Sequence, residues 1–461
     1  MTFINGLLIF FSVIIVYFLL VYFLHKKEIL KKYNISLYGP ALLLRTTKGI
    51  GFLKKISSKK RFWKAYGSSG IVFCFVCMVI FVIFFFWQFS FVIGLSPEER
   101  ATLLPGAEFY VILPGINPIL PIEYLFYIVV ALIVAIIVHE FSHGILTLAG
   151  DLKVKSMGLL YLIFPIGAFV EPDEEQMKKT TISKRMRVYA VGPLSNFVVF
   201  FICLLLFSFV FISAVVPGDG LTVYELFEDS PADEIGIQKG AIITEINGTD
   251  LTKYDTLDDR FEQYIIMLND TKANDTITIS YIFDNVVHND VEIKLVDKFN
   301  YIQMNSSKGK GYTGIYTFVD EERNLDRLKN PFGDPLLRLL NFISIPILGY
   351  FQGYNPIASP FTSSYSIVGP LGIIPTEIFW IIVNTIYWVA WLNLMIGIFN
   401  ILPMVPLDGG FLFNDGVRLI VKNIKKGISD ENLDKIVRKV TLVVSLIILF
   451  VIISPIFLRY V

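Results

Sequence analysis

Residues 126–143 read Phe-Tyr-Ile-Val-Val-Ala-Leu-Ile-Val-Ala-Ile-Ile-Val-His-Glu-Phe-Ser-His, so an apolar run ends in the segment His139 to His143. The uncharged part predicts a membrane-spanning helix. Two histidines four residues apart lie on one face of a helix, about 6 Å apart, where both can reach one Zn²⁺. Glu140 lies beside them, close enough to take a proton from water without binding the metal. Three ionisable groups in so apolar a turn are costly unless something binds them, which favours a metal site over packed histidines.

The composition of the chain is that of a membrane protein. Its 461 residues are 54% hydrophobic and include 41 Phe, and the mean hydropathy is +0.63, which is too apolar for an ordinary soluble protein. Apolar runs long enough to cross a bilayer, about 20 residues each, lie at 3–24, 69–94, 122–149, 188–216, 374–400 and 440–458. The predicted fold class is a polytopic α-helical membrane protein with about six transmembrane helices.

Basic residues set the predicted orientation. Residues 25–66 hold many Lys and Arg but one acid, Glu28, so the positive-inside rule places this loop in the cytoplasm. Alternation then puts 217–373 outside, and 150–187 and 411–439 inside, where both segments are basic. The absence of cysteines from the outer segments favours a prokaryotic plasma membrane.

The chain is expected to have six parts. They are a first transmembrane helix (1–24), a basic cytoplasmic loop (25–66), transmembrane helices that include the HExxH helix (67–216), an extracytoplasmic domain (217–300), an extracytoplasmic linker with an interfacial helix (301–373) and the last transmembrane helices (374–461). The interfacial helix is the run Leu336–Phe351, which is short and contains Arg338 and Pro346. If it crossed the bilayer instead, residues 374–400 would run in the opposite direction.

The extracytoplasmic domain has an informative stretch at Ser230–Gly248. Its sequence predicts a capped short helix, a glycine turn, a strand and an Asn-Gly turn, in that order. This order resembles a circularly permuted PDZ domain, of the type found in membrane and periplasmic proteases. The resemblance implies a small β-rich α+β domain. Such a domain could bind the new C-terminus left by a first cleavage, through a backbone nest near Gly220 and Leu221, or exclude bulky ectodomains.

A catalytic zinc usually has three protein ligands, so a third must be found. Glu171, Glu174 and Glu175 are candidates by distance along the chain, but a solvated turn also explains them. Asp408 is the stronger candidate, because it follows an apolar span, where an unpaired carboxylate is expensive. It lies in the segment Asn400-Ile-Leu-Pro-Met-Val-Pro-Leu-Asp-Gly-Gly, whose prolines end the helix and whose glycines allow close backbone approach.

The segments that carry His139 and Asp408 are predicted to reach the same depth in the bilayer. A helix that enters near Ile122 reaches His139 after about 26 Å of a hydrocarbon layer ~30 Å thick, near the cytoplasmic edge. The span 374–400 runs the same way and brings Asp408 to the same edge. The two halves of the site can therefore meet.

These motifs together resemble the site-2 protease family of intramembrane zinc metalloproteases, over roughly residues 120–410. The family pattern combines HExxH in one span with NxxPxxPLDGG after a later one. Gly192-Pro-Leu-Ser-Asn196 resembles its GPxxN element, and residues 158–171 resemble its membrane-associated hairpin. The resemblance implies cleavage in or near a transmembrane segment of a membrane protein that another protease has usually trimmed first. The expected partners are such substrates and the lipid bilayer, with no nucleic acid.

The expected chemistry uses one Zn²⁺ per chain, held by His139, His143 and Asp408. The metal polarises the scissile carbonyl and makes a water acidic, while Glu140 takes the water proton and passes it to the leaving amine. Asn196 and Asn400 could hold an unwound substrate or stabilise the oxyanion, or could equally form hydrogen bonds between helices.

Two other classes of protein compete with this interpretation. The first is a non-catalytic membrane receptor or scaffold that carries a PDZ domain and a structural zinc. A structural site would not need Glu140 and would normally close its fourth position. The second is a zinc transporter, which would need acidic residues or histidines along several spans rather than at one depth.

Overall fold

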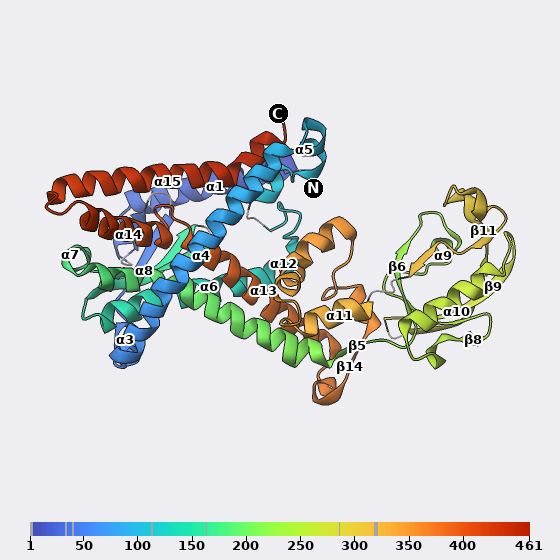
Figure 1. Cartoon of the computed structure of the whole chain (residues 1–461). Coiled ribbons are helices and arrows are strands. Elements are labelled where there is room, and N and C mark those ends of the chain that lie inside the picture. The colour runs from blue at the N-terminus through green and yellow to red at the C-terminus, as the bar shows by residue number, and fades with distance from the viewer. Residues whose placement is uncertain are drawn as a thin grey trace. The chain divides into compact units, whose positions relative to one another are not determined.

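The computed structural model describes residues 3–32, 35–38, 41–111, 114–162, 164–284, 286–317 and 321–461. Its contacts divide the chain into two units (Figure 1). The first unit comprises Met1–Ile202 and Trp388–Val461, and the second comprises Cys203–Tyr387. Both parts of the candidate metal site lie in the first unit.

Five helices in the described part of the chain are long and apolar enough to cross a membrane. They are Lys60–Gly94 (α4), Ile122–Ala149 (η2, Ile122–Tyr124, with α6, Leu125–Ala149), Ile182–Ala214 (α8, Ile182–Leu205, with η3, Leu206–Phe211, and η4, Ile212–Ala214), Thr376–Ile401 (α13) and Asp430–Leu458 (α15). They confirm five of the expected spans. The first span coincides with helix α1, Phe3–Lys26, but within it only the shorter stretch Phe11–Lys26 counts as apolar helix, so this crossing remains a prediction.

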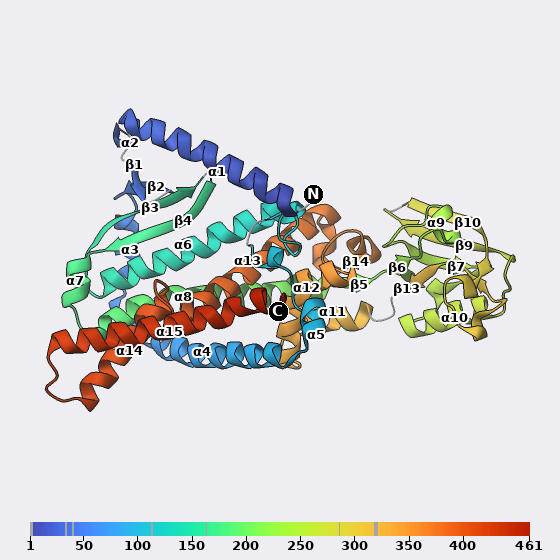
Figure 2. The same cartoon turned by 90° about the horizontal axis from the view of Figure 1, so that it is seen from above.

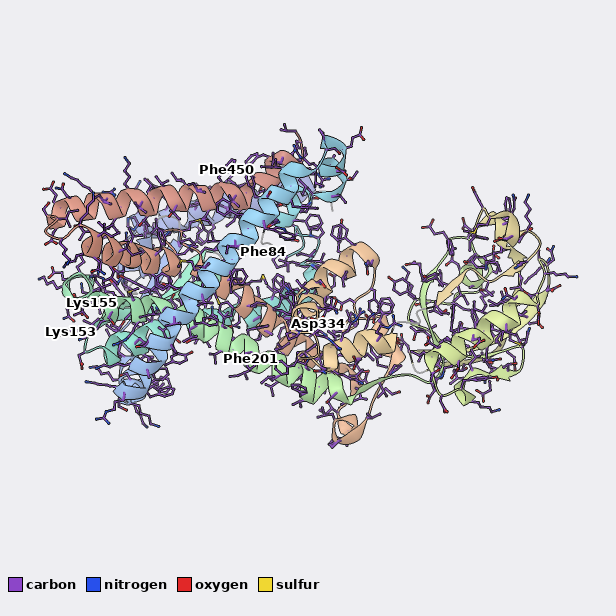
Figure 3. The ribbon with its side chains drawn as sticks, viewed as in Figure 1. Phe84, Lys153, Lys155, Phe201, Asp334 and Phe450 are labelled. Atoms are coloured by element: carbon purple, nitrogen blue, oxygen red, sulfur yellow. The ribbon has the colours of Figure 1, made fainter. Side chains whose placement is uncertain are left out.

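The spans carry exposed apolar side chains along their length. Phe84 of α4, Phe201 of α8 and Phe450 of α15 are all exposed, and they project from their helices in Figure 3. Exposed aromatic side chains in such number are typical of helices that contact lipid. The three cysteines are free and lie in these spans: Cys74, Cys77 and Cys203.

An antiparallel sheet of four strands lies next to α6. Its order is β1-β2-β3-β4, with bounds Ile35–Tyr38, Ala41–Thr46, Val154–Leu162 and Phe164–Pro172. Strands β3 and β4 pair as a hairpin at the place where the family resemblance implies one. Strands β1 and β2 come from the basic segment 25–66, which was expected to be a loop only. Figure 2 shows the sheet between α1 and α6, and the Tyr17 hydroxyl of α1 donates to the Tyr161 carbonyl of β3 at 3.2 Å.

The first unit contains further short elements around the spans. They are α2 (Ile29–Lys32), α3 (Ile50–Ser57), α5 (Pro97–Leu103), η1 (Ala107–Tyr110), α7 (Glu174–Lys179) and α14 (Asp408–Ile424). Helix α3 helps to cover the sheet, because Leu53 is fully buried in a cluster with Met157 and Val170 of the hairpin and with Ile145 of α6.

The second unit contains the expected β-rich domain. Its main sheet has the order β10-β9-β7-β6-β13, and β8 pairs with β7. The strands are β6 (Leu221–Leu226), β7 (Ile242–Ile246), β8 (Thr249–Asp250), β9 (Thr276–Phe283), β10 (Val286–Lys294) and β13 (Ile315–Thr317), and the helices are α9 (Pro231–Glu234) and α10 (Leu257–Asn269). Ser230 caps α9, as expected, by accepting a hydrogen bond from the Asp233 amide.

The β-rich domain extends past its expected end at residue 300. Ile315 of β13 pairs with Leu226 of β6 in an antiparallel ladder, so the sheet includes residues to at least 317. We call residues 218–317 the inserted domain. Smaller elements of this unit are β5 (Val215–Pro217), η5 (Leu251–Lys253), β11 (Val296–Asp297), η6 (Lys298–Asn300), η7 (Asn305–Ser307), β12 (Gly311–Tyr312), α11 (Glu321–Lys329), η8 (Phe361–Ser364), β14 (Tyr365–Ile367) and η9 (Gly369–Ile373).

The expected interfacial helix is α12, Pro335–Gln352. It begins after Asp334, whose carboxylate accepts a hydrogen bond from the Leu337 amide at 3.4 Å, and it is not among the five candidate spans. Phe342 is buried, with its ring 5.3 Å from that of Phe207, whereas Leu336 and Phe351 are exposed. Its place at a membrane surface remains a prediction.

Candidate metal centre

The two histidines of the HExxH segment lie on one face of α6. Both residues are buried, with exposed fractions of 8% for His139 and 9% for His143, and their ring centroids are 4.8 Å apart. The spacing of four residues places both imidazoles on the same side, as the sequence predicts.

Asp408 reaches the site because the chain folds back after α13. The helix ends at Ile401 and α14 begins at Asp408. A Cβ atom on Gly409 would lie 2.0 Å from the Ile401 carbonyl oxygen, and one on Gly410 would lie 2.5 Å from the Met404 carbonyl carbon. Only glycine allows so close an approach between backbones. The two glycines therefore act as expected from the sequence.

Three donor atoms converge at this point. The Asp408 Oδ2 atom lies 2.9 Å from His139 Nε2 and 3.1 Å from His143 Nε2, and the ligand atoms all lie within 4.8 Å of one another. Across the ranges that the structure describes, no other three His, Cys, Asp or Glu residues bring their ligand atoms together in a way that could hold a metal ion. Two imidazole nitrogens and a carboxylate oxygen form a donor set that suits zinc and leaves a position for water or substrate.

The outer nitrogen of His143 also suits a metal. Its Nδ1 atom lies 2.7 Å from the Val188 carbonyl oxygen of α8. A carbonyl only accepts, so Nδ1 carries the hydrogen and the lone pair of Nε2 faces the site. A backbone partner of this kind fixes the orientation of a metal-binding imidazole.

His139 has a similar partner in Asn196, another residue of α8. The Asn196 side chain is fully buried, and its Nδ2 atom lies 3.3 Å from His139 Nδ1. Its Oδ1 atom has no hydrogen-bond partner among the described residues. When Nε2 of His139 binds a metal, Nδ1 must carry its hydrogen and needs an acceptor. The unpartnered Oδ1 supplies that acceptor when the amide turns over, so the environment fits the metal.

Gly192 lets α8 approach both imidazoles. A Cβ atom there would lie 2.5 Å from His143 Nε2 and 2.8 Å from His139 Nε2. These distances are far below van der Waals contact, so even a methyl group would displace one of the rings. The GPxxN segment is recognisable in the sequence only by resemblance, and the structure gives its glycine a steric reason.

Glu140 is placed by the sheet. The Val170 amide of β4 donates a hydrogen bond to Glu140 Oε2 at 3.0 Å. The carboxylate is half-buried and does not belong to the cluster of metal donors. It is therefore available as a proton acceptor beside the site.

The other candidates for third ligand have different partners. Glu171 accepts a hydrogen bond from Ser156 Oγ at 2.6 Å and pairs with Arg45. The Ser156 hydrogen bond and, after it, the Arg45 guanidinium hold the pKa of the Glu171 carboxyl below its ordinary value. Glu174 and Glu175 are exposed and lie near lysines one turn further along α7. None of the three joins the histidines.

Asn400 forms a hydrogen bond within α13. Its Nδ2 atom donates to the Ile396 carbonyl of its own helix at 3.0 Å. The structure thus separates the two candidate asparagines: Asn196 contacts a histidine of the cluster, and Asn400 binds within α13.

Hydroxyl groups not predicted from the sequence link the helices behind the site. Ser142 Oγ lies 2.7 Å from Ser195 Oγ, and Ser195 Oγ lies 3.1 Å from the Tyr66 hydroxyl of α4. Ser142 and Ser195 occupy variable positions of the HExxH and GPxxN motifs. Their positions inside these two motifs are the feature of the sequence that could have pointed to this contact.

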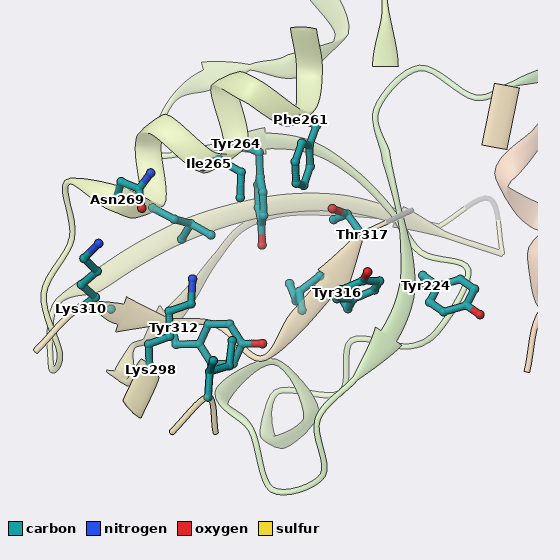
Figure 4. A pocket seen from close by; sticks show the side chains of 14 residues that line it. Tyr224, Phe261, Tyr264, Ile265, Asn269, Lys298, Lys310, Tyr312, Tyr316 and Thr317 are labelled. Carbon is teal, nitrogen blue, oxygen red and sulfur yellow. The ribbon is translucent and has the colours of Figure 1, made fainter. Parts of the chain in front are cut away.

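A cavity of about 540 Å³ lies in the inserted domain. Figure 4 shows its lining, with Phe261 and Tyr264 of α10 opposite β13, and with Lys298, Lys310 and Asn269 together at one end. We call this cavity the groove. Gly220 and Leu221 do not line it, because Leu221 is fully buried in the sheet core. The structure therefore does not bring these two predicted residues to the groove.

Comparison with known proteins bears on both units. The model of peptidase family M50 matches residues 127–448. The uncharacterized protein MJ0971 of Methanocaldococcus jannaschii is 28% identical over 86% of this chain and 83% of its own length. The zinc metalloprotease RasP of Shouchella clausii is 24% identical over 55% of this chain and 56% of its own. A putative zinc metalloprotease of Clostridium acetobutylicum is 23% identical over 62% of this chain and 86% of its own.

One solved structure is also similar. The PDZ domain of the SdrC-like protein of Listeria monocytogenes shows 24% identity, covers 23% of this chain and 96% of its own, and has a TM-score of 0.18.

The family model spans well over half of the chain, from within α6 to within α15. It includes both histidines, Glu140 and the aspartate that the structure places against them. The chain belongs to peptidase family M50, and its His-His-Asp cluster is a candidate for the metal site of a zinc metalloprotease.

Proposed function

We propose that this chain is an intramembrane zinc metalloprotease that hydrolyses peptide bonds in or near transmembrane segments of other membrane proteins. One observation carries the proposal: two imidazole nitrogens and one carboxylate oxygen converge within 4.8 Å. Both imidazoles come from α6, which belongs to an apolar span long enough to cross a bilayer, and the carboxylate begins α14, which follows the span α13. Membership in peptidase family M50 supports the same reaction class.

In this proposal His139, His143 and Asp408 hold one Zn²⁺ per chain. When bound, zinc supplies Lewis-acid chemistry, which polarises the scissile carbonyl and lowers the pKa of a water. Glu140 accepts the proton of that water and delivers it to the leaving amine. The Val170 amide holds the Glu140 carboxylate for this task, and Val188 and Asn196 keep the imidazoles turned toward the site.

A receptor with a structural zinc explains these features less well. A structural site normally has four protein ligands, whereas three donors gather here. It would also give no reason for a carboxylate held by a backbone amide beside the first histidine. Both features favour a catalytic site.

The substrate must unwind before cleavage, because a helix hides its amide groups in its own hydrogen bonds. Asn400 remains a candidate to hold the unwound strand, since it lies close in the chain to Asp408 and is half-buried. We place the site near the cytoplasmic face of a prokaryotic plasma membrane, with the inserted domain outside, since the basic segments fit that orientation.

Metal removal tests the proposal. We expect a chelator to abolish cleavage of a detergent-solubilised transmembrane substrate by the purified chain, and one equivalent of zinc to restore it. The Asp408→Asn variant should bind zinc at least 10-fold more weakly and cleave correspondingly slowly, because it loses a charged ligand. Equal zinc affinity in this variant and the parent would remove Asp408 from the site.

We further propose that the groove, rather than Gly220 and Leu221, is where the inserted domain binds peptide. Strand β13 forms an end of the described sheet order, so an extended peptide can add beside it and place side chains against α10. Lys298 and Lys310 at one end of the groove would attract a carboxylate. The new C-terminus that a first cleavage leaves has such a group.

Charge reversal tests this second role. A chain with Lys298→Glu and Lys310→Glu should cleave a trimmed substrate more slowly than the parent, with untrimmed substrate unaffected. Lys294→Glu is the matched control, because Lys294 is exposed on β10 and does not line the groove. If the double variant and the control behave alike, the groove does not bind the substrate through these lysines.

A further inference from the structure

One face of α8 touches both imidazoles of the metal centre. Val188 and Asn196 contact the two imidazoles, and Gly192 packs against both rings. Residues 185, 189, 192 and 196 follow one another at intervals of four, three and four, and residue 188 precedes 192 by four, so these positions lie along one side of the helix. Arg185 and Tyr189 extend the same face away from the imidazoles and toward α14.

Arg185 forms a bidentate ion pair with Asp415 of α14. Its Nη2 atom lies 2.6 Å from Asp415 Oδ1, and its Nε atom lies 3.0 Å from Oδ2. The side chains are 15% and 5% exposed. One turn nearer the metal donors, the Tyr189 ring stacks on the Phe411 ring with centroids 5.3 Å apart. Two contacts in line therefore join α8 to α14.

The spacing within α14 connects this pair to the metal ligand. Asp408 begins the helix, and Asp415 follows seven residues later, which is two turns along the same face and about 10 Å along the axis. The backbone hydrogen bonds of an α-helix fix the relative positions of residues two turns apart. Fixing Asp415 and Phe411 on α8 thus fixes the rotation and height of Asp408.

We infer that Arg185 and Asp415 are positioning residues for the zinc site: their buried ion pair aligns the Asp408 helix with the helix that orients both histidines. Such a pair is suited to alignment, because a guanidinium and a carboxylate meet in one planar geometry. Burial makes the loss of either partner costly, since the other is left as an uncompensated charge. This inference rests on the proposed zinc site.

A second ion pair on α14 supplies a matched control. Arg418 pairs with Asp434 of α15, and the two side chains are 25% and 61% exposed. This pair lies on the same helix but does not connect it to α8. Arg418→Gln therefore removes an ion pair from α14 while leaving its contact with the helix that holds the imidazoles.

The test measures zinc affinity, by competition with a chelator, in the folded full-length chain. We expect Arg185→Gln and Asp415→Asn each to weaken zinc binding about 10- to 100-fold, the effect typical of residues behind metal ligands. Arg418→Gln should keep the parental affinity. Parental affinity in Arg185→Gln and Asp415→Asn, or an equal loss in Arg418→Gln, would overturn the inference.

A swapped variant separates alignment from general stability. Arg185→Asp combined with Asp415→Arg reverses the pair, and we expect it to bind zinc more tightly than either Arg185→Asp or Asp415→Arg alone. If the swap restores the thermal midpoint but not the zinc affinity, the pair supports the fold and does not align the site. A parent chain that binds no zinc would instead refute the proposed function itself.

Discussion

At the scale of single residues, the imidazoles are held by a helix other than their own. Gly192 of α8 lies against both rings, and a Cβ atom there would come within 2.8 Å of each of them. We expect Gly192→Ala to push one ring away and to lower the zinc content of the purified chain well below that of the parent. Gly94→Ala is the control, because Gly94 is also in a span and a Cβ there meets no atom within 4 Å. Full zinc content in Gly192→Ala would contradict the steric account.

Asn196 carries a second residue-scale prediction. Its amide is the partner of His139 Nδ1, so Asn196→Ala should weaken zinc binding about 10- to 100-fold. Asn400→Ala should leave zinc affinity unchanged, because the Asn400 amide binds the Ile396 carbonyl of its own helix. Chelator competition measures both. A larger loss in Asn400→Ala than in Asn196→Ala would reverse the assignment of the two asparagines.

The sequence predicts some of these residues and not others, for a physical reason. His139, Glu140 and His143 follow from helix geometry within a single turn. Asp408 is predictable because an unpaired carboxylate next to an apolar span costs free energy, so a metal-binding role is expected for it. The ion pair of Arg185 with Asp415 joins residues 230 apart in the chain, and no local pattern indicates such a partner.

At the scale of elements, the hairpin is tied to the N-terminal strands by Glu171 and Arg45. The pKa of Glu171 is lowered in the folded chain, so its charged form stabilises the fold above the ordinary Glu pKa of about 4.3. That contribution is lost as the pH falls through the lower pKa of the folded chain. We expect the parent to have a higher thermal midpoint than Glu171→Gln at neutral pH, with the difference shrinking below about pH 4.

The exposed Glu174 provides the comparison for that pH series. Glu174→Gln should differ little from the parent at any pH, because an exposed pair of the i, i+4 type contributes little. A pH-independent difference between the parent and Glu171→Gln would show that the carboxylate charge does not stabilise the sheet.

The elements also show where sequence reasoning stops. The five long apolar helices follow from composition alone. Strands β1 and β2 are short, and β2 pairs with β3, more than a hundred residues away, as in Arg45 with Gly158. Pairing over such a separation leaves no periodic signal inside the strands themselves. The same reason explains why β13, which pairs with β6, lies beyond the expected end of the inserted domain.

At the scale of the whole molecule, the expected orientation depends on α12 not crossing the membrane. The exposed positions Met304, Ile373 and Ile424 test this when changed singly to cysteine. Only α13 separates Ile373 from Ile424 among the candidate spans, so these two sites should react with a membrane-impermeant thiol reagent from opposite sides. Met304 and Ile373 should react from the outside. Labelling of Met304 and Ile373 from opposite sides would mean that α12, which lies between them in the chain, spans the bilayer.

The most direct test of the central claim concerns Glu140, which lies beside the metal donors without being one of them. The measurement is the rate of cleavage of a transmembrane substrate by Glu140→Gln, with bound zinc determined in the same sample. We predict zinc content equal to that of the parent and a loss of at least 100-fold in rate, because the proton acceptor is gone. Parental cleavage by a zinc-loaded Glu140→Gln chain would contradict the account.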